Sequence, residues 1–235
     1  MTEDIKLSNR LLLVASYLPK GANFADIGSD HAYLPCFVCQ QDPTATAIAG
    51  EVNVGPLSSA QETINKYNLN EYVEARLGDG LSVLQQNEVN QVVIAGMGGS
   101  LIRTILENGK DKLSSVNLII TQPNVDEKNV RNWFMENHFN IQDESILEEN
   151  GHIYEIIVGI RVNNATTLSE KEQLFGPKLL AQRNELFYKK WESERVKLIR
   201  VISQMQNAKN QDREKISKFQ EQLGWIEEVL EDDHY

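Results

Sequence analysis

The chain contains little cysteine and no long apolar run, and each of these absences excludes a class of protein. Its 235 residues include only two cysteines, which excludes a disulfide framework. The apolar run from Leu11 to Ala15 is too short to cross a bilayer and predicts an amphipathic helix that caps a sheet. Residues 1–10 are polar and mixed in charge, unlike a secretory signal. We therefore expect a cytoplasmic protein that makes no membrane contact.

Cys36 and Cys39 form a C-x-x-C motif, which by itself would favour a thioredoxin-like redox protein. The side chains around them make an apolar helix face: Tyr33, Leu34, Phe37 and Val38. We therefore predict buried structural thiols. No second cysteine or histidine pair follows, and the four histidines are scattered, so the sequence predicts no metal site.

Positive charge is also scarce, since 23 Lys and Arg stand against 34 Asp and Glu and give a net charge of −11. This excess of acid opposes binding to nucleic acid, because Lys and Arg neutralise phosphates. Residues 171–218 nevertheless hold 12 basic and 6 acidic side chains, a local charge of +6. At the centre of this segment lies the basic belt, which we define as Lys189, Lys190, Arg195, Lys197 and Arg200. The belt fits a docking surface for a polyanion, and equally the ordinary solvated face of a charged helix.

What the chain does contain is a regular alternation of strand and helix patterns. Five apolar segments predict strands, each ending in a polar or glycine-rich turn: 23–27, 45–50, 73–77, 91–95 and 117–121. Helical stretches follow, beginning near residue 32 and covering 56–67, 100–106 and 127–137, and a closing β-hairpin is predicted over 141–147 and 153–162. The pattern predicts an α/β fold with a parallel, doubly wound sheet and a ligand site along its carboxyl edge.

The first turn, in the segment DIGSDHAYLP, indicates the kind of ligand. A dinucleotide site needs glycines spaced G-x-G-x-x-G, but here Asp30 and Tyr33 follow Gly28 at the later positions. Asp30 would repel a phosphate, whereas carboxylates at Asp26 and Asp30 suit the sulfonium and ammonium of S-adenosylmethionine. The alternative is an ordinary strand-turn-helix with solvated acids.

Two further acids follow later strands. Glu51 comes 25 positions after Asp26, where a carboxylate can accept hydrogen bonds from ribose hydroxyls. Asp79, in Gly78-Asp79-Gly80, could accept from the amino group of adenine, although Gly-Asp-Gly is more often a plain turn.

The C-terminal region predicts a second, helical domain. A polar linker covers 163–167, Ser169 and Glu172 have capping-box spacing, and Gly176-Pro177 interrupts the helix. Two stretches of heptad-compatible apolar residues then flank the polar segment 207–212. We predict domains at 1–162 and 163–235, the second a coiled-coil hairpin that could bind RNA or form a homodimer.

The motifs DIGSDHAYLP, GEVNVGPLSSA, ARLGDGL, IAGMGG and TQPN, in this order and at these separations, resemble the bacterial TrmK family. These enzymes are tRNA adenine N1-methyltransferases that modify adenine 22, and the resemblance covers nearly the whole chain. It implies a class I Rossmann-like methyltransferase domain with a seven-stranded, mostly parallel sheet and S-adenosylmethionine as cofactor.

The resemblance also assigns cofactor-binding residues. It places Asp26, Gly28 and Asp30 at the methionine end of the cofactor, Glu51 at its ribose, and Asp79 with Gly80 at its adenine. The floor beside the sulfonium would be Ala95, Gly96, Met97, Gly98 and Gly99. Within the same motifs, Ser29, Val52 and Asn53 are also expected to contact the cofactor.

The chemistry itself points to Gln122, Pro123 and Asn124 as the catalytic segment. Ring N1 of neutral adenine already carries a lone pair, so the enzyme must position the base and stabilise positive charge, and no general base is required. The amide carbonyls of Gln122 and Asn124 could accept from the exocyclic amine, with Pro123 fixing the backbone. The segment resembles the Asn-Pro-Pro-aromatic motif of amino-methylating enzymes but lacks its aromatic residue, and Tyr33, Tyr154 and His152 are the candidates for that role. The alternative is a turn with local hydrogen bonds.

We therefore predict a methyltransferase that acts on N1 of an adenine in tRNA. The alternatives are a methyltransferase of another nucleobase or a small molecule, and a non-catalytic RNA-binding or scaffold protein.

Overall fold

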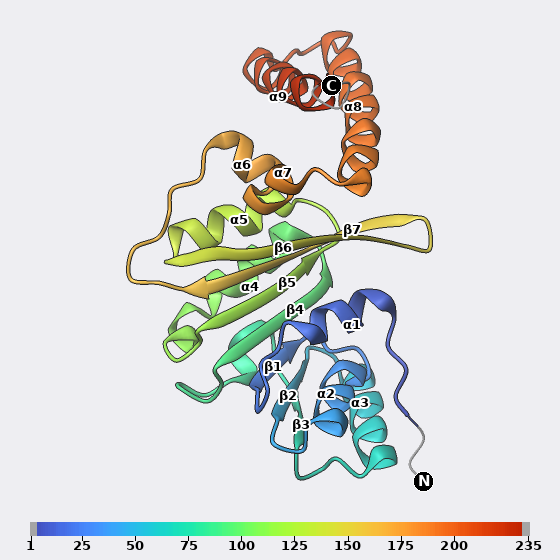
Figure 1. Ribbon diagram of the computed structural model, residues 1–235, viewed down its shortest axis with the longest axis vertical. Coiled ribbons are helices and arrows are strands. Elements are labelled where there is room, and N and C mark those ends of the chain that lie inside the picture. The colour runs from blue at the N-terminus through green and yellow to red at the C-terminus, as the bar shows by residue number, and fades with distance from the viewer. Residues whose placement is uncertain (1–3, 232–235) are drawn as a thin grey trace. The chain divides into compact units, whose positions relative to one another are not determined.

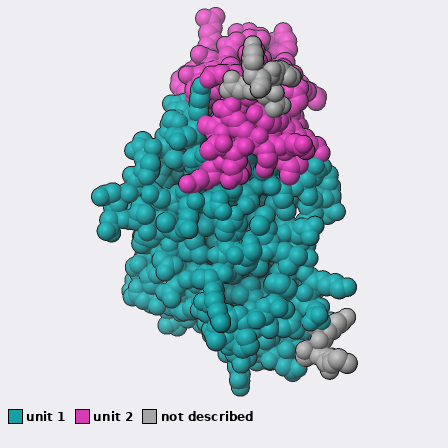
Figure 2. Space-filling model, in the orientation of Figure 1, with its two compact units in different colours: residues 1–177 teal, residues 178–235 magenta. Residues whose placement is uncertain are grey.

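The computed structural model describes residues 4–231, which form two compact units that divide after Pro177 (Figure 2). The first unit contains the sheet and the second contains two long helices (Figure 1). Among the described residues, no helix is both long and apolar enough to cross a membrane.

The sheet of the first unit has seven strands in the order β3-β2-β1-β4-β5-β7-β6. The strand bounds are β1 Asn23–Ile27, β2 Thr46–Glu51, β3 Val73–Leu77, β4 Gln91–Met97, β5 Leu118–Pro123, β6 Phe139–Glu149 and β7 His152–Arg161. The strands β1 to β5 pair in parallel, whereas β7 runs antiparallel to both β5 and β6. The predicted doubly wound sheet and its closing hairpin are confirmed.

Helices cover both faces of the sheet, because the central strands carry continuous buried runs whose successive side chains point to opposite faces. On one face, Phe24, Val93 and Ile120 join a core with α1 (Asn9–Ser16), α2 (Tyr33–Gln41) and α3 (Val54–Tyr67). On the other face, Val92 and Ile119 join a core with α4 (Gly99–Asn108) and α5 (Glu127–Glu136). Two short 3-10 helices, η1 (Gly80–Val83) and η2 (Lys110–Leu113), complete the connections. The layers place every strand-to-helix turn of β1 to β5 at one edge, the carboxyl edge.

Strands β4 and β5 run further than the sequence predicts. Ala95 pairs with Gln122, and after a register shift Met97 pairs with Pro123. Gln122 and Pro123 are therefore the last residues of a buried strand, and only Asn124 lies in the turn.

The boundary between the units lies after Pro177, later than the predicted boundary at Val162. Residues 163–177 belong with the sheet because α6 (Glu170–Phe175) is hydrogen-bonded to α5. Arg131 Nη1 on α5 donates to the carbonyl of Leu174 at 3.0 Å. The position of Gly176, at φ +84°, admits no side chain, since a Cβ would lie 2.5 Å from Glu144 Oε1. The capping box of Ser169 and Glu172 is present as predicted.

The second unit begins at Lys178, so it contains α7 (Pro177–Gln182) except for its first residue. It also contains α8 (Glu185–Gln206) and α9 (Arg213–Glu231). Helices α8 and α9 pack together through buried apolar residues, which include Phe187, Trp191, Ile216 and Ile226. The two predicted helices and the polar segment between them are confirmed, while the coiled-coil supercoil stays a prediction.

The cysteines lie on α2, and both thiols are free and buried. Burial raises the pKa of each to about 12, so neither is a thiolate at neutral pH. The interpretation of this motif as buried structural thiols is confirmed.

Candidate functional site

The site lies where the sheet changes direction, between the carboxyl ends of β1 and β4. The chain runs outward from β1 through β2 to β3, then returns to β4 on the other side of β1, and ligands bind at such a switch point. The turns after the two strands touch: Gly28 has φ +70°, and a Cβ there would collide with Cε of Met97. Only glycine leaves room for Met97 and a close ligand.

Two buried carboxylates face this turn. Asp26 is 4% exposed and its Oδ2 accepts from Ser29 Oγ at 2.6 Å. Glu51, 5% exposed at the end of β2, uses Oε1 to accept from the backbone N–H of Asp30 at 2.5 Å. The turn is therefore bound to both strands, and both acids keep oxygen atoms for a further donor.

Within residues 4–231, no lysine or arginine forms an ion pair with either carboxylate, and the pKa of each is raised. Burial raises the pKa of Asp26 to about 7, with the nearby Glu51 adding to the shift. Burial also raises the pKa of Glu51, and the charge of Asp30 adds to this shift, while the hydrogen bond from the Asp30 N–H and the nearby His31 oppose it. A site that holds two acids above their usual pKa favours a ligand that carries positive charge and hydrogen-bond donors.

Three consecutive residues of the first turn have left-handed backbone: Asp30 at φ 43°, His31 at 68° and Ala32 at 54°. Left-handed conformations cost side-chain-bearing residues about 1–2 kcal/mol each, so such a run is unusual outside functional turns. Within this run, His31 Nε2 lies 3.4 Å from Asp30 Oδ1.

The third strand brings a further group to the same edge. The N–H of Gly78 donates to the carbonyl of Glu51 at 2.8 Å, so the turn that carries Asp79 and Gly80 adjoins β2. Asp79 is exposed, as are Val52 and Asn53 after Glu51, with Val52 60% exposed.

The floor of the site comes from β4 and the start of α4. Ala95 and Met97 are strand residues, Gly96 between them is exposed, and Gly98 precedes α4. The N–H of Gly99 donates to the carbonyl of Val125 at 2.8 Å. The turns after β4 and β5 are thus joined.

The predicted catalytic segment is placed differently from expectation. Gln122 is fully buried, and its Oε1 accepts from Arg10 Nη1 and from the N–H of Gly96, the latter at 3.0 Å. Its Nε2 donates to the Pro123 carbonyl at 3.0 Å and to Asn124 Oδ1 at 3.1 Å. Because this amide is used within the protein, Gln122 does not offer its carbonyl to a substrate. Asn124 is exposed, and its Nδ2 donates to the Gly96 carbonyl at 2.8 Å.

Arg10, on α1, is a site residue that sequence reasoning missed. Besides its bond to Gln122, its guanidinium carbon lies 5.4 Å from the ring centroid of Tyr154 and its Nε lies 4.0 Å from Glu149 Oε2. No spacing or motif relates position 10 to position 122, so the sequence held no signal for this contact.

Of the three aromatic candidates for stacking on the base, Tyr154 lies nearest to the catalytic segment in the network of contacts. Its ring packs against the guanidinium of Arg10, which is hydrogen-bonded to Gln122. The ring of His152 lies 6.3 Å from that of Tyr154, at the exposed start of β7. Tyr33 belongs to the first turn, where its ring lies 5.5 Å from that of His31 and is 43% exposed.

The basic belt lies entirely on α8, and acids of the same helix pair with part of it. Arg195 Nη2 lies 2.7 Å from Glu192, and Lys197 Nζ lies 2.7 Å from Glu194. Lys189 and Arg195 also line a hollow together with Glu227 and Glu231 of α9. The belt is therefore less positive than its sequence suggests.

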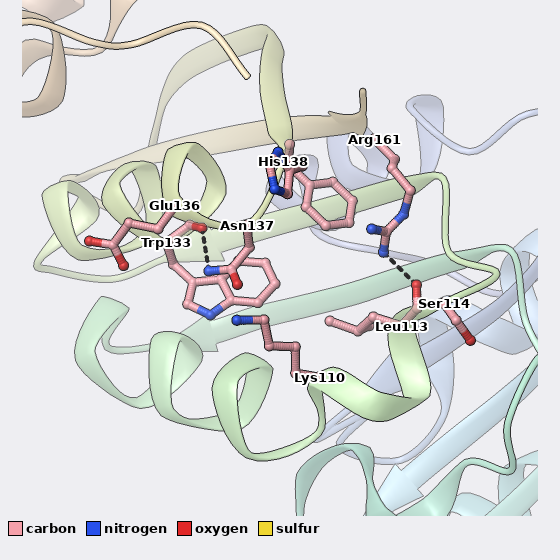
Figure 3. A pocket seen from close by; sticks show the side chains of 9 residues that line it. Lys110, Leu113, Ser114, Trp133, Glu136, Asn137, His138 and Arg161 are labelled. Atoms are coloured by element: carbon pink, nitrogen blue, oxygen red, sulfur yellow. Dashed lines mark hydrogen bonds between the residues drawn. The ribbon is translucent and has the colours of Figure 1, made fainter. Parts of the chain in front are cut away.

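A separate hollow of about 260 Å³ lies at the opposite edge of the sheet (Figure 3). It opens near the start of β6 and the end of β7, where Arg161 Nη2 donates to the carbonyl of Leu113 and Asn137 Nδ2 to that of Trp133. It is not part of the carboxyl-edge site. Within residues 4–231, no group of three or more His, Cys, Asp and Glu side chains is placed to hold a metal ion.

The geometry can be tested against S-adenosylmethionine. Two buried acids suit its ammonium and ribose hydroxyls, and the turn at Gly28 leaves backbone space for a close ligand. The same acids would repel a pyrophosphate. The residues present therefore fit this cofactor and exclude a dinucleotide.

Comparison with known proteins agrees. A family model described as TrmK, tRNA (adenine(22)-N(1))-methyltransferase, matches residues 24–228. A tRNA (adenine(22)-N(1))-methyltransferase of Bacillus subtilis (strain 168) is 40% identical over 235 residues, which cover 97% of this chain and 98% of that protein.

Solved structures show the same likeness. A putative tRNA (m1A22) methyltransferase of Streptococcus pneumoniae, in complex with S-adenosyl-L-methionine, has a TM-score of 0.86 at 38% identity, covering 96% of this chain and 100% of that one. TrmK of M. capricolum, in complex with S-adenosyl-homocysteine, has a TM-score of 0.81 at 29% identity, covering 96% and 98%. The chain belongs to the TrmK family of S-adenosylmethionine-dependent tRNA (adenine(22)-N(1))-methyltransferases.

Proposed function

We propose that this chain carries out the reaction of its family, methylation of N1 of adenine 22 in tRNA, by positioning both reactants over the carboxyl edge of its sheet. The observation that supports this most is the pair of buried acids at the switch point, Asp26 and Glu51, whose pKa values burial raises. S-adenosylmethionine, when bound, supplies an electrophilic methyl group and a positive charge.

The cofactor side of the site divides among the three turns. Asp26 and Asp30 hold the ammonium, with Ser29 orienting the carboxylate of Asp26 through its 2.6 Å hydrogen bond. Glu51 accepts from the ribose hydroxyls with the oxygen that does not hold the Asp30 N–H. Asp79 accepts from the adenine amino group, since its turn adjoins Glu51. The remaining members of this site are Gly28, Val52, Asn53, Gly80 and residues 95–99.

On the substrate side, Asn124 is the catalytic residue. Its exposed Oδ1 has one lone pair engaged by Gln122 and another free to accept from the exocyclic amine of the target adenine. Because N1 of adenine has its own lone pair, no proton need be removed before the transfer. Asn124 stabilises the positive charge that the methylated ring acquires.

The cofactor assignment predicts a specific effect of Glu51→Gln. The variant keeps an oxygen for the Asp30 N–H but replaces the oxygen that accepts from ribose with a donor. We expect S-adenosyl-homocysteine to bind about 10- to 100-fold more weakly by calorimetry, since a hydrogen bond to a charged group contributes about 1.5–3 kcal/mol. Glu62→Gln, an exposed glutamate on α3, is the control. Unchanged affinity in Glu51→Gln would remove Glu51 from the site.

The second proposal concerns the basic belt, which we assign to the backbone of tRNA. Exposed ion pairs such as Arg195–Glu192 contribute only about 0–1 kcal/mol, so a phosphate can replace the carboxylate at little cost. Arg200 is exposed and has no ion-pair partner in the part of the chain that the structure describes. It should therefore carry more of the electrostatic binding than Arg195.

Salt dependence tests the belt. Arg200→Ala should flatten the log–log slope of tRNA affinity against salt by about 0.7–0.9, one counterion. Arg195→Ala should flatten it less, and Lys6→Ala, on an exposed residue of the first unit, should leave it unchanged. Identical slopes in all three variants, together with a dimeric mass by light scattering, would favour homodimerisation through the hairpin over docking.

A further inference from the structure

A chain of hydrogen bonds connects Arg10 of α1 with the substrate side of the site. Arg10 Nη1 donates to Gln122 Oε1, and Gln122 Nε2 donates to Asn124 Oδ1 at 3.1 Å. We propose that Arg10 is a positioning residue for methyl transfer, which acts through Gln122 to fix the orientation of the Asn124 amide, whose oxygen keeps one lone pair for the target base. This inference rests on the catalytic role proposed for Asn124.

Fixed groups of the backbone determine which way each amide points. The N–H of Gly96 requires an oxygen at Gln122 Oε1, and the carbonyl of Pro123 requires an N–H at Gln122 Nε2. The Gly96 carbonyl in turn requires Asn124 Nδ2 at 2.8 Å, which leaves Asn124 Oδ1 on the side of Gln122. Both amides are thus set in one orientation, and a flip of either would bring like groups together.

Arg10 contributes the charged donor in this network. A charge-assisted hydrogen bond is about twice as strong as a neutral one, and hydrogen bonds in a chain strengthen one another. Arg10 is itself oriented, because Tyr154 lies 5.4 Å beneath its guanidinium and Glu149 approaches its Nε. Glu149 Oε1 also accepts from the N–H of Asn9 at 2.7 Å, which holds the start of α1 against the sheet.

The orientation of Asn124 matters for the choice of base. An oxygen at the free position of Asn124 accepts from the amino group of adenine, whereas an amide nitrogen there would meet that amino group donor to donor. The same oxygen would repel the carbonyl oxygen that guanine carries at the equivalent atom. Arg10 therefore supports both the rate and the recognition of an exocyclic amine.

A double-mutant cycle tests the proposal. With full-length protein and tRNA, Arg10→Met should lower kcat about 10- to 100-fold, as expected when a reacting group is misplaced, and leave KM for tRNA and its salt dependence unchanged. In an Asn124→Ala background, Arg10→Met should have little further effect, because the group it positions is gone. Arg10→Lys, which keeps a charged donor, should retain more activity than Arg10→Met.

Two controls distinguish a loss of positioning from a general effect of removing an arginine and from unfolding. Arg103→Met, which removes a partly exposed arginine paired with Glu136 at 2.7 Å, should leave kcat unchanged. S-adenosyl-homocysteine affinity reports whether the first unit stays folded, and Arg10→Gln replaces Arg10→Met in the cycle if the latter does not fold.

Two results would overturn the role of Arg10: an unchanged kcat in Arg10→Met, or an equal loss in the presence and absence of Asn124. A raised KM with a flatter salt slope would also contradict it, since that identifies Arg10 as a phosphate contact. If instead Asn124→Ala leaves kcat unchanged, the proposed role of Asn124 fails, which is a different outcome.

Discussion

Asp26 combines burial, charge and function in one side chain. It is 4% exposed, and among the described residues its carboxyl accepts a hydrogen bond from Ser29 alone and has no lysine or arginine as an ion-pair partner. Burying a carboxylate in this way destabilises the fold unless the group takes up a proton or a positive ligand arrives. Asp26 therefore lowers the stability of the unliganded protein, and we propose that it stabilises the complex with a positively charged ligand.

This conflict predicts a pH dependence. The pKa of Asp26 is raised to about 7 by burial, so between about pH 4 and 7 the folded chain holds a proton that the unfolded chain releases. The unliganded protein should therefore lose stability as pH rises through this range. Asp26→Asn stays neutral, so its advantage in Tm over the unsubstituted chain should grow from about pH 5 to 8. A difference in Tm that does not change with pH would contradict the assignment.

Ligand binding should show the opposite trend at the same carboxyl. We expect affinity for S-adenosylmethionine to rise toward pH 7 and then level off, because only the ionised Asp26 holds the ammonium. Asp26→Asn should bind weakly at every pH. Calorimetry in buffers of different ionisation enthalpy would detect the proton that the unsubstituted chain releases.

The acids of the site could be predicted from the sequence, and the groups that orient them could not. Asp26 and Glu51 end apolar strands, so their place at the carboxyl edge follows from the strand pattern alone. The left-handed run at 30–32 has no glycine to indicate it. Arg10 meets Gln122 only because α1 folds across the sheet, which no local pattern encodes.

At the scale of elements, a buried ion cluster joins α5, β6, β7 and α6. Arg131 is fully buried, with Nε 2.7 Å from Glu144 and Nη2 2.5 Å from Glu155. Its Nη1 caps carbonyls at the end of α6. The cluster explains why the first unit extends to Pro177. Arg131 Nη1 binds the carbonyls of Gln173 and Leu174, 42 and 43 positions later in the chain, and so holds α6 against the sheet.

Arg131→Met tests this connection. Removing one partner of a buried pair leaves uncompensated charge, so the free energy of unfolding should fall by about 3–5 kcal/mol. Arg103→Met, which removes the partly exposed partner of Glu136 from α4, should change it by about 1 kcal/mol or less. Urea denaturation of both variants makes the comparison, and equal losses would show that burial does not set the cost.

The pattern of apolar residues predicted which strands and helices exist, but not where β5 ends or which element binds α6. Strand β5 continues through Pro123 because Met97 is there to pair with it, and this depends on the neighbouring strand. Polar residues at 163–167 resemble a linker, and the contacts of Arg131 that follow them are long-range.

At the scale of the whole molecule, a chain of net charge −11 must bind a polyanion. Its acids include those that we propose to hold the cationic cofactor, while a segment of +6 lies in the helical region. Composition predicted this division, whereas the pairing of Arg195 and Lys197 with acids one turn away on α8 required the structure. We expect low salt to favour tRNA binding, with Arg200 contributing more than its paired neighbours.

The most direct test of the account is mass spectrometry of nucleosides from tRNA incubated with the protein and methyl-labelled S-adenosylmethionine, with the position mapped by reverse transcription. We predict label in 1-methyladenosine at position 22, none in a transcript with guanosine there, and none with Glu51→Ala. Label in another nucleoside or at another position, or equal label in both transcripts, would contradict it.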